Sequence, residues 1–262
     1  MGLKDEPFLE QAPRANGVYL LSDPTPFEAL FARVRAAEMR IRTDAELALI
    51  PDGTGLWNAD EWRLRARGAD RLLHALRPFT SGARLIEVGC GNGWLANKLH
   101  NAGFDVLGID TSTEELEQAV RVFGDGPVFA RADPFDVDLP AHGFDVVVFA
   151  ASFHHFMDAA RTIERAKTFL RPGGRSIFWT RYSTRPRPKS KRPWNAADFT
   201  IPTWASPKWR SIATRIPFDP FKSLGLTSDP RHRAWIARCG ASVGKHRLSA
   251  TWCCTVNRHS PL

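Results

Sequence analysis

The 262-residue chain lacks several features that would define other classes of protein. It has no run of about 20 apolar residues, which a membrane-spanning helix needs. Its first residues, MGLKDEPFLEQAP, carry acids and lack the apolar centre of a secretory signal. Its four cysteines, Cys90, Cys239, Cys253 and Cys254, follow neither a zinc-ligand spacing nor a disulfide framework. We therefore expect a cytoplasmic protein with no metal site and no membrane span.

Acidic residues are scarce in the last third of the chain. Residues 175–262 contain 17 lysines and arginines but only three aspartates, so their formal charge is +14. Residues 1–174 contain 19 basic and 25 acidic residues and carry −6, which leaves the chain at +8. Six of the nine tryptophans also lie in the basic part. This asymmetry predicts an anionic partner for the C-terminal third, without specifying which one.

From residue 84 onward, short apolar runs alternate with helical patterns. We expect strands at 84–89, 104–110, 126–133, 144–150 and 176–182, and helices at 93–103, 112–123 and 158–170. The run FDVVVFA at 144–150 is apolar almost throughout, as a strand buried on both faces should be. The alternation predicts an α/β fold, a doubly wound and mostly parallel sheet with helices on both faces.

Four segments are expected along the chain. Residues 1–80 form an N-terminal arm and helical lid, and residues 81–182 form the sheet core. Residues 183–229 are a basic insertion rich in Trp and Pro, and residues 230–262 supply a closing helix and closing strands. The turn-rich link between the first two helices separates the lid into two parts.

The first 25 residues read as an irregular arm, followed by helices at 26–42 and 58–79. Asp60 is expected to cap the second helix. We expect both helices to pack over the mouth of a site and to use Trp57, Trp62 and Arg63. The alternative is that they cover one face of the sheet.

A glycine-rich turn, IEVGCGNGW at residues 86–94, follows the first expected core strand. A dinucleotide fingerprint needs a small residue where this chain has Trp94, because helix and strand pack closely there. No Gly-Lys-Ser/Thr follows, so a phosphate-binding P-loop is excluded. Glycines at 89, 91 and 93 instead indicate a turn whose backbone a different ligand approaches closely.

This turn, EVGCGNG, closely resembles motif I of class I (Rossmann-like) S-adenosylmethionine-dependent methyltransferases. Four further features appear in the order of that family: Asp110 in LGIDTS, Asp133 in RADP, the run FDVVVFAASFHHF, and FLRPGGR. The resemblance covers about residues 84–180 and is of the methyltransferase-11 or ubiquinone/menaquinone-methyltransferase type. It implies a methyltransferase with S-adenosyl-L-methionine as cofactor, and it makes residues 81–182 the cofactor-binding core.

The resemblance also implies roles for single residues. Asp110 would hold the ribose hydroxyls through charge-assisted hydrogen bonds, and Asp133 would lie near the adenine amino group. Glu87 suits a cationic sulfonium, or it supports the glycine turn through hydrogen bonds. The implied cofactor-binding residues are Glu87, Gly89, Cys90, Gly91, Asn92, Gly93, Asp110, Thr111, Asp133, Pro134, Ala150 and Ala151.

Methyl transfer from a sulfonium is an in-line displacement, in which an enzyme contributes mainly proximity, orientation and exclusion of water. A base is needed only if the nucleophile still carries its proton. His155 and His154 follow the expected strand 144–150, where a substrate pocket should open, and we prefer His155 as the base. Alternatively, one ring packs and the other caps the next helix.

The acceptor is expected to be a small molecule, and an anionic one if the insertion contacts it. The cations Arg185, Arg187, Lys189, Lys191 and Arg192 precede Trp194, Trp204 and Trp209. The same side chains suit RNA, so a nucleic-acid methyltransferase is the alternative. It is disfavoured because AASFHHF lacks the Asn/Asp-Pro-Pro-aromatic motif of amine methyltransferases. A non-catalytic binding module with this fold is a further alternative.

Overall fold

The computed structural model describes residues 2–182 and 250–257. Of these, residues 2–180 and 251–257 form one compact unit. The helices are η1 (Leu3–Asp5), α1 (Pro7–Glu10), α2 (Pro26–Ala37), α3 (Asp44–Ala48), α4 (Ala59–Leu76), α5 (Trp94–Asn101), α6 (Thr113–Phe123), η2 (Phe153–His155) and α7 (Ala159–Phe169). The strands are β1 (Arg14–Ala15), β2 (Val18–Leu20), β3 (Arg84–Val88), β4 (Asp105–Asp110), β5 (Val128–Arg131), β6 (Phe144–Ala150), β7 (Leu170–Tyr182) and β8 (Ala250–Asn257).

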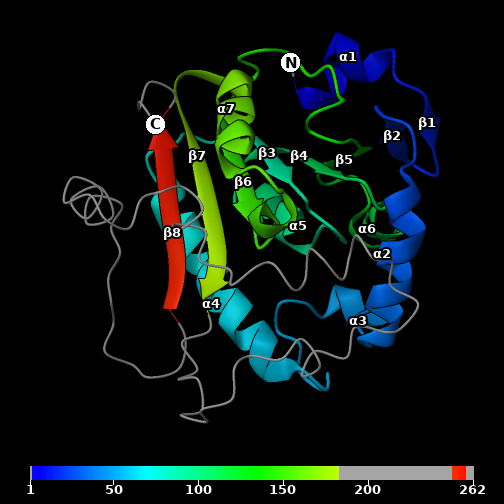
Figure 1. Cartoon of the computed structure of the whole chain (residues 1–262). Helices are drawn as coiled ribbons and strands as arrows, with labels where there is room; N and C mark the ends of the chain where they lie inside the picture. The colour runs from blue at the N-terminus through cyan, green and yellow to red at the C-terminus, as the bar shows by residue number, and fades with distance from the viewer. Residues whose placement is uncertain (1, 183–249, 258–262) are drawn as a thin grey trace, which may run out of the picture. The chain divides into compact units, whose positions relative to one another are not determined.

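The strands form one sheet in the order β1-β2-β5-β4-β3-β6-β7-β8 (Figure 1). β3 pairs in parallel with β4 on one side and β6 on the other, and β5 and β7 continue the parallel pairing outward. The chain therefore starts its core in the middle of the sheet and adds strands in both directions. The predicted doubly wound, mostly parallel α/β fold is confirmed.

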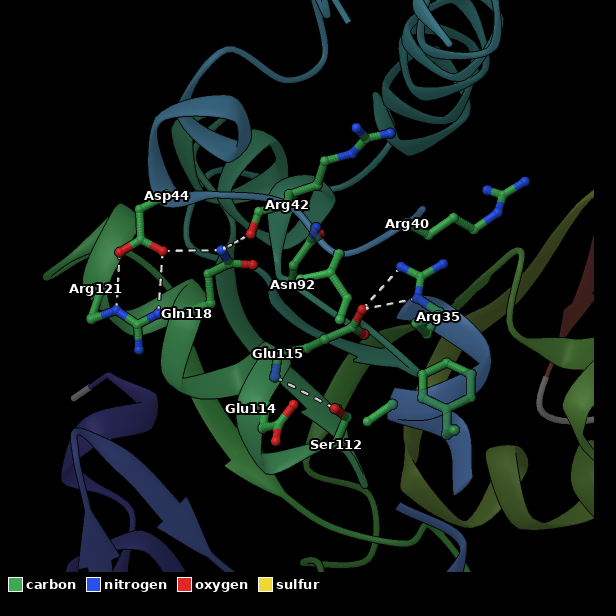
Figure 2. A pocket seen from close by; sticks show the side chains of 13 residues that line it. Arg35, Arg40, Arg42, Asp44, Asn92, Ser112, Glu114, Glu115, Gln118 and Arg121 are labelled. Carbon is green, nitrogen blue, oxygen red and sulfur yellow. Dashed lines mark hydrogen bonds and ion pairs between the residues drawn. The ribbon is translucent and has the colours of Figure 1, made fainter. Parts of the chain in front are cut away.

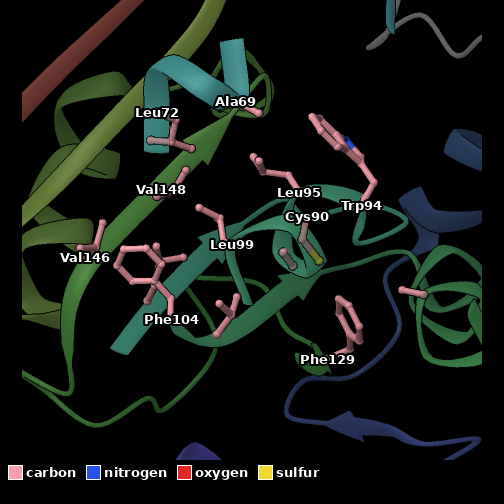
Figure 3. Packing of buried hydrophobic residues seen from close by; sticks show 14 of the residues in the cluster. Ala69, Leu72, Cys90, Trp94, Leu95, Leu99, Phe104, Phe129, Val146 and Val148 are labelled. Atoms are coloured by element: carbon pink, nitrogen blue, oxygen red, sulfur yellow. The ribbon is translucent and has the colours of Figure 1, made fainter. Parts of the chain in front are cut away.

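Alternate residues of the central strands face the two sides of the sheet. Val146 and Val148 of β6 belong to a buried cluster that includes residues of α4 and α5 (Figure 3). On the other face, Phe149 stacks on Phe178 of β7 at 5.1 Å between ring centroids. The buried side chains of α7, among them Ile163 and Phe169, lie outside that first cluster. Both faces are thus covered, which explains why β6 is apolar at nearly every position.

The N-terminal arm is not irregular, contrary to the sequence-based expectation. β2 pairs in parallel with β5, and β1 pairs antiparallel with β2, so residues 14–20 extend the edge of the sheet. The Leu3 amide donates to Asp105 Oδ2 at 2.7 Å, which fixes the arm to β4. Leu3 and Leu9 are completely buried. Short apolar pieces between Pro and Gly carried too little periodicity to predict these strands.

Two local expectations are also corrected. Asn58 occupies the N-cap position of α4, and Asp60 lies within its first turn. RPGGR at 171–175, expected as a turn, is part of β7, where the pairing with β6 shifts register and Gly173 has φ 82°. The closing strand expected at 250–257 is confirmed as β8. The insertion 183–229, and the helix and strand expected between 229 and 249, lie outside the described residues.

α4 packs directly on the sheet through its buried face, which includes Trp62, Ala69 and Leu72. Trp62 meets Trp94 of α5 edge-to-face at 5.6 Å. Gly68 allows an especially close approach, since a Cβ there would stand 2.0 Å from Trp179 Cζ2. Among the described helices, none is long and apolar enough to cross a membrane.

The Gly68 contact predicts the effect of a single methyl group. Gly68→Ala should lower the free energy of unfolding by about 1–3 kcal/mol through overpacking, despite about 1 kcal/mol gained in helix propensity. In a Trp179→Leu background the clash is relieved, so the same substitution should become stabilising. Urea unfolding of the native protein, the two single variants and the double variant measures the effect of Gly68→Ala on the free energy of unfolding in both backgrounds. A stabilising Gly68→Ala in the presence of Trp179 would contradict this packing.

Candidate active site

The glycine turn joins β3 to α5 with three left-handed residues. Gly89, Gly91 and Gly93 have φ of 74°, 53° and 73°. A Cβ at Gly89 would stand 2.4 Å from Ser152 Cβ, and one at Gly93 would stand 2.5 Å from the Phe129 ring. Packing of the protein therefore accounts for these two glycines. At Gly91 the nearest atom is the carboxylate tip of Glu115, so Gly91 is the position at which backbone remains approachable.

Asp110 ends β4 and ties three elements together. Its Oδ2 accepts the Gly91 amide at 2.8 Å, and its Oδ1 accepts the Ser112 amide at 2.9 Å. Burial raises the pKa of the Asp110 carboxyl, and these backbone amides oppose that rise. Each carboxylate oxygen can accept a further hydrogen bond. The arrangement thus leaves acceptors for two ligand hydroxyls while it holds the glycine turn in place.

Glu87 lies inside β3, only 2% exposed. The Ala96 backbone amide donates to its carboxylate, but Oε2 has no hydrogen-bond partner among the described residues. Burial, and then the negative charge of Asp110, raise the pKa of Glu87 well above its ordinary value. A buried carboxylate oxygen without a partner is costly. This site is suited to a cation, such as the ammonium or sulfonium of the expected cofactor.

The remaining expected cofactor residues occupy the same edge of the sheet in different ways. Asp133 Oδ1 accepts the Phe135 amide at 2.8 Å, and the Asp133 amide donates to Ser22 Oγ at 3.2 Å. Cys90 points into the buried cluster (Figure 3), where burial raises the pKa of its thiol. Its side chain is thus part of the core, and only its backbone faces the turn.

The other members of that set are Asn92, Thr111, Pro134 and Ala151, which lie in the loops after β3, β4, β5 and β6, and Ala150, which ends β6. Asn92 is buried and lines a cavity described below. Pro134 is buried, whereas Ala151 is exposed and left-handed, with φ 57°. All the expected cofactor residues are therefore gathered at the carboxyl ends of β3 to β6, where doubly wound sheets bind ligands.

His154 and His155 form η2, directly after β6. The loop is anchored because Ser152 Oγ donates to the Val88 carbonyl at 2.5 Å, and the Ala151 amide donates to the Trp179 carbonyl at 2.7 Å. The two imidazole rings lie 4.0 Å apart. Partial burial and the neighbouring ring lower the pKa of His154 to about 4, and partial burial and Arg35 lower the pKa of His155. Both rings are therefore neutral at physiological pH, although both keep exposed edges.

Helix α2 crosses this edge and brings residues that the sequence did not predict for the site. Phe31 meets His155 edge-to-face at 6.2 Å, and Arg35 pairs with Glu115 of α6 at 2.9 Å. Ser112 and Glu115 have the spacing of a capping box, in which the Glu115 carboxylate would accept the Ser112 amide. Ser112 Oγ does accept the Glu115 amide at 3.4 Å, but the Glu115 carboxylate binds Arg35 instead. No local pattern reveals a partner 80 residues away.

A cavity of about 250 Å³ lies between α2 and α6 (Figure 2). Arg35 and Glu115 line one part of it, Asn92 lies in the glycine turn, and the Asp44–Arg121 ion pair closes the far end. Within the described residues, no group of His, Cys, Asp and Glu side chains is placed to hold a metal ion.

The aromatic and basic residues expected to cover the mouth from α4 do not do so. Trp62 is buried in the core, and Arg63 is an exposed partner of Asp60. Trp57 is 61% exposed and donates from Nε1 to the Met39 carbonyl at 3.3 Å. α4 is therefore a cover of the sheet, and the described contacts with the site come from α2.

Sheet order, glycine turn and terminal acid together define a class I methyltransferase fold. The family described as "Methyltransferase domain" matches residues 86–178. The chain is 37% identical over 131 residues to the 27-O-demethylrifamycin SV methyltransferase of Amycolatopsis mediterranei, covering 46% of this chain and 47% of that protein. It is 31% identical over 108 residues to the ubiquinone biosynthesis O-methyltransferase of Paraburkholderia phymatum, covering 40% and 45%.

A solved S-adenosylmethionine-dependent methyltransferase from Mesorhizobium loti is 32% identical, with a TM-score of 0.40 over 44% of this chain and 54% of that one. The chain spans about half the length of the curated relatives it matches. The family and sequence matches support the predicted class I S-adenosylmethionine-dependent methyltransferase superfamily for the part of the chain that they cover. The match is to its methyltransferase-11 type of domain.

Because Glu87 Oε2 has no hydrogen-bond partner among the described residues, we expect Glu87 to lower stability while it favours ligand binding. Its raised folded-state pKa means that the protonated form contributes stability below about pH 4.3, the unfolded-state value. That contribution is lost as the pH rises through the folded-state pKa. Glu87→Gln should therefore raise the free energy of unfolding by about 1 kcal/mol at pH 8 and much less at pH 4.

Urea unfolding at both pH values tests this prediction, with Glu114→Gln on the exposed start of α6 as the control. The control should change stability little at either pH. The same Glu87 variant should bind S-adenosylhomocysteine more weakly. A Glu87→Gln protein that is less stable than the native protein at pH 8 would show that the carboxylate is already satisfied.

Proposed function

We propose that this chain is an S-adenosylmethionine-dependent methyltransferase that transfers a methyl group to a small-molecule acceptor by in-line displacement. One observation carries the proposal. The Asp110 carboxylate stands at the end of β4 with both oxygens anchored by backbone amides, close to the buried Glu87, whose Oε2 has no partner among the described residues. Two acceptors for ribose hydroxyls and one site for a cation match the ribose and the methionine portion of this cofactor.

The residues that would hold the cofactor follow from these contacts. Asp110 accepts the ribose hydroxyls, Glu87 faces the charged methionine portion, and Gly91 provides approachable backbone between them. Asp133 and the buried Pro134 border the adenine side, beyond β5. When bound, the cofactor supplies an electrophilic methyl group and a neutral thioether leaving group.

His155 is proposed as the general base. Its lowered pKa keeps the imidazole neutral at physiological pH, so it can accept a proton from an acceptor hydroxyl or ammonium. The Phe31 ring borders it and excludes water from one side. His154 lies 4.0 Å away and packs on it, which fits a positioning role for the second ring.

A small-molecule acceptor is supported by the names of two relatives. They are a methyltransferase of 27-O-demethylrifamycin SV and an O-methyltransferase of ubiquinone biosynthesis. We therefore favour a hydroxyl acceptor over an amine. The cysteine usage of the chain supports a cytoplasmic location.

Calorimetry with Asp110→Ala tests cofactor binding. The native chain should bind S-adenosylhomocysteine and not NAD, and the substitution should weaken that binding at least tenfold, because charge-assisted hydrogen bonds contribute roughly 1.5–3 kcal/mol each. Asp136→Ala, on an exposed acid three residues past Asp133, is the control and should bind normally. Tight NAD binding, or an unchanged affinity in Asp110→Ala, would refute the proposal. Binding without methyl transfer to any acceptor in a labelled-methyl screen would favour the non-catalytic alternative.

A nucleic-acid acceptor is the alternative, favoured by the formal charge of +14 in residues 175–262. A protein that contacts 6–10 phosphates loses about 10³–10⁵ in affinity between 50 and 200 mM salt. We expect weak RNA binding with this steep slope and no sequence preference, while cofactor affinity stays constant. Filter binding of total tRNA and of random RNA at several salt concentrations measures the RNA affinity, its salt dependence and any sequence preference. Sequence-selective RNA binding that persists at 200 mM salt would favour the alternative.

A further inference from the structure

Helix α2 differs from the other long helices in how it is held. None of its residues 28–37 is fully buried, whereas α4 buries five residues in the core. Cavities of about 250 and 240 Å³ lie along α2, and both are lined by Ala32, Ser112 and Glu114. A helix with few buried apolar contacts can open at low free-energy cost. Apolar packing therefore does not fix α2 over the site.

Among the described residues, three contacts link α2 to site elements. Glu28 Oε1 accepts the Thr113 amide at 2.6 Å, in the first turn of α6. Arg35 donates to Glu115 Oε1 from Nη2 at 2.9 Å and from Nε at 3.2 Å (Figure 2). Phe31 lies edge-to-face on His155. The helix thus spans from the start of α6 to the proposed base.

The Arg35–Glu115 pair lies against the approachable part of the glycine turn. Glu115 Oε2 is 2.9 Å from the position of a Cβ on Gly91, whose amide is bound by Asp110. A ligand that lies on Gly91 therefore contacts or displaces Glu115. The side chains of Arg35 and Glu115 are only 25% and 20% exposed, so this ion pair is less screened than a surface pair.

We propose that α2 is a latch over the cofactor site, and that Arg35 and Glu115 are positioning residues that couple closure of this helix to occupancy of Gly91. This inference rests on the proposed cofactor binding. Arg35 also carries a positive charge near two carboxylates, Asp110 and Glu115. That charge favours the ionised forms of both. Loss of Arg35 should therefore loosen α2 and weaken the ribose contact together.

Hydrogen exchange of the full-length chain with S-adenosylhomocysteine as probe tests the coupling. Calorimetry first establishes that the native chain binds the probe. Binding should then slow exchange of the amides in residues 26–37 about tenfold, with little change in α4. In Arg35→Gln, the added protection of α2 should be lost.

Stopped-flow release of the same probe tests the ion pair. Arg35→Gln and Glu115→Gln should each speed release about fivefold, and the double variant no more than the larger single effect, because contacting residues are not additive. Arg121→Gln is the matched control, since it breaks an ion pair of α6 with Asp44, further along the same helix than Glu115. It should change release less than twofold. Glu115→Gln keeps the shape of the side chain and serves if Arg35→Gln folds poorly.

The outcomes separate the two ideas. If the native chain fails to bind the probe, the proposed function fails and the latch fails with it. Normal binding without added protection of α2 would overturn the latch alone. Additive effects of the two substitutions, or an equal effect of Arg121→Gln, would also overturn it.

Discussion

The site depends on the carboxylate of Asp110. It stands where β4 ends, and it accepts one hydrogen bond from an amide of the glycine turn and one from an amide at the start of α6. These two hydrogen bonds set the distance between two loops that follow neighbouring parallel strands. Without them the left-handed turn at Gly91 would lack a partner for its amide, and α6 would lose its approach to the sheet. Ligand binding and loop structure therefore use the same side chain.

The cost of this arrangement is an accumulation of negative charge. Burial raises the pKa of all three carboxyls, Glu87, Asp110 and Glu115. The negative charge of Asp110 raises the pKa of Glu87 and of Glu115 further. Backbone amides satisfy part of Asp110, and Arg35 compensates Glu115. Glu87 keeps one oxygen without a partner among the described residues. A cationic ligand would offset the negative charge that remains. The electrostatics of the site therefore favour a ligand with a positive charge, as the proposed cofactor has.

Much of the core was predictable because its signals are local. The apolar run at 144–150 predicted β6 to the residue, and the glycine spacing with Asp110 predicted the site edge. Errors arose where distant contacts override local patterns. Glu115 forms no capping box because Asp110 accepts the Ser112 amide and Arg35 binds the Glu115 carboxylate. At Gly89 and Gly93 the structure adds a reason that the sequence did not show, because a Cβ there would clash with Ser152 and Phe129, and their contact with a cofactor stays a prediction.

The matched family region begins at residue 86, so the N-terminal extension lies outside it. Yet this extension supplies walls of the site at two places. Ser22, just after the edge strand β2, receives the Asp133 amide, and α2 reaches Glu115 and His155. The matched region thus contains the glycine turn, Asp110 and Asp133, and the segment from β2 to α2 adds contacts to them from outside that region. Phe31 and Arg35 touch the side where an acceptor would approach His155. Under the proposed function, a substitution of Phe31 can therefore change how an acceptor reaches His155 without any change in the glycine turn or Asp110.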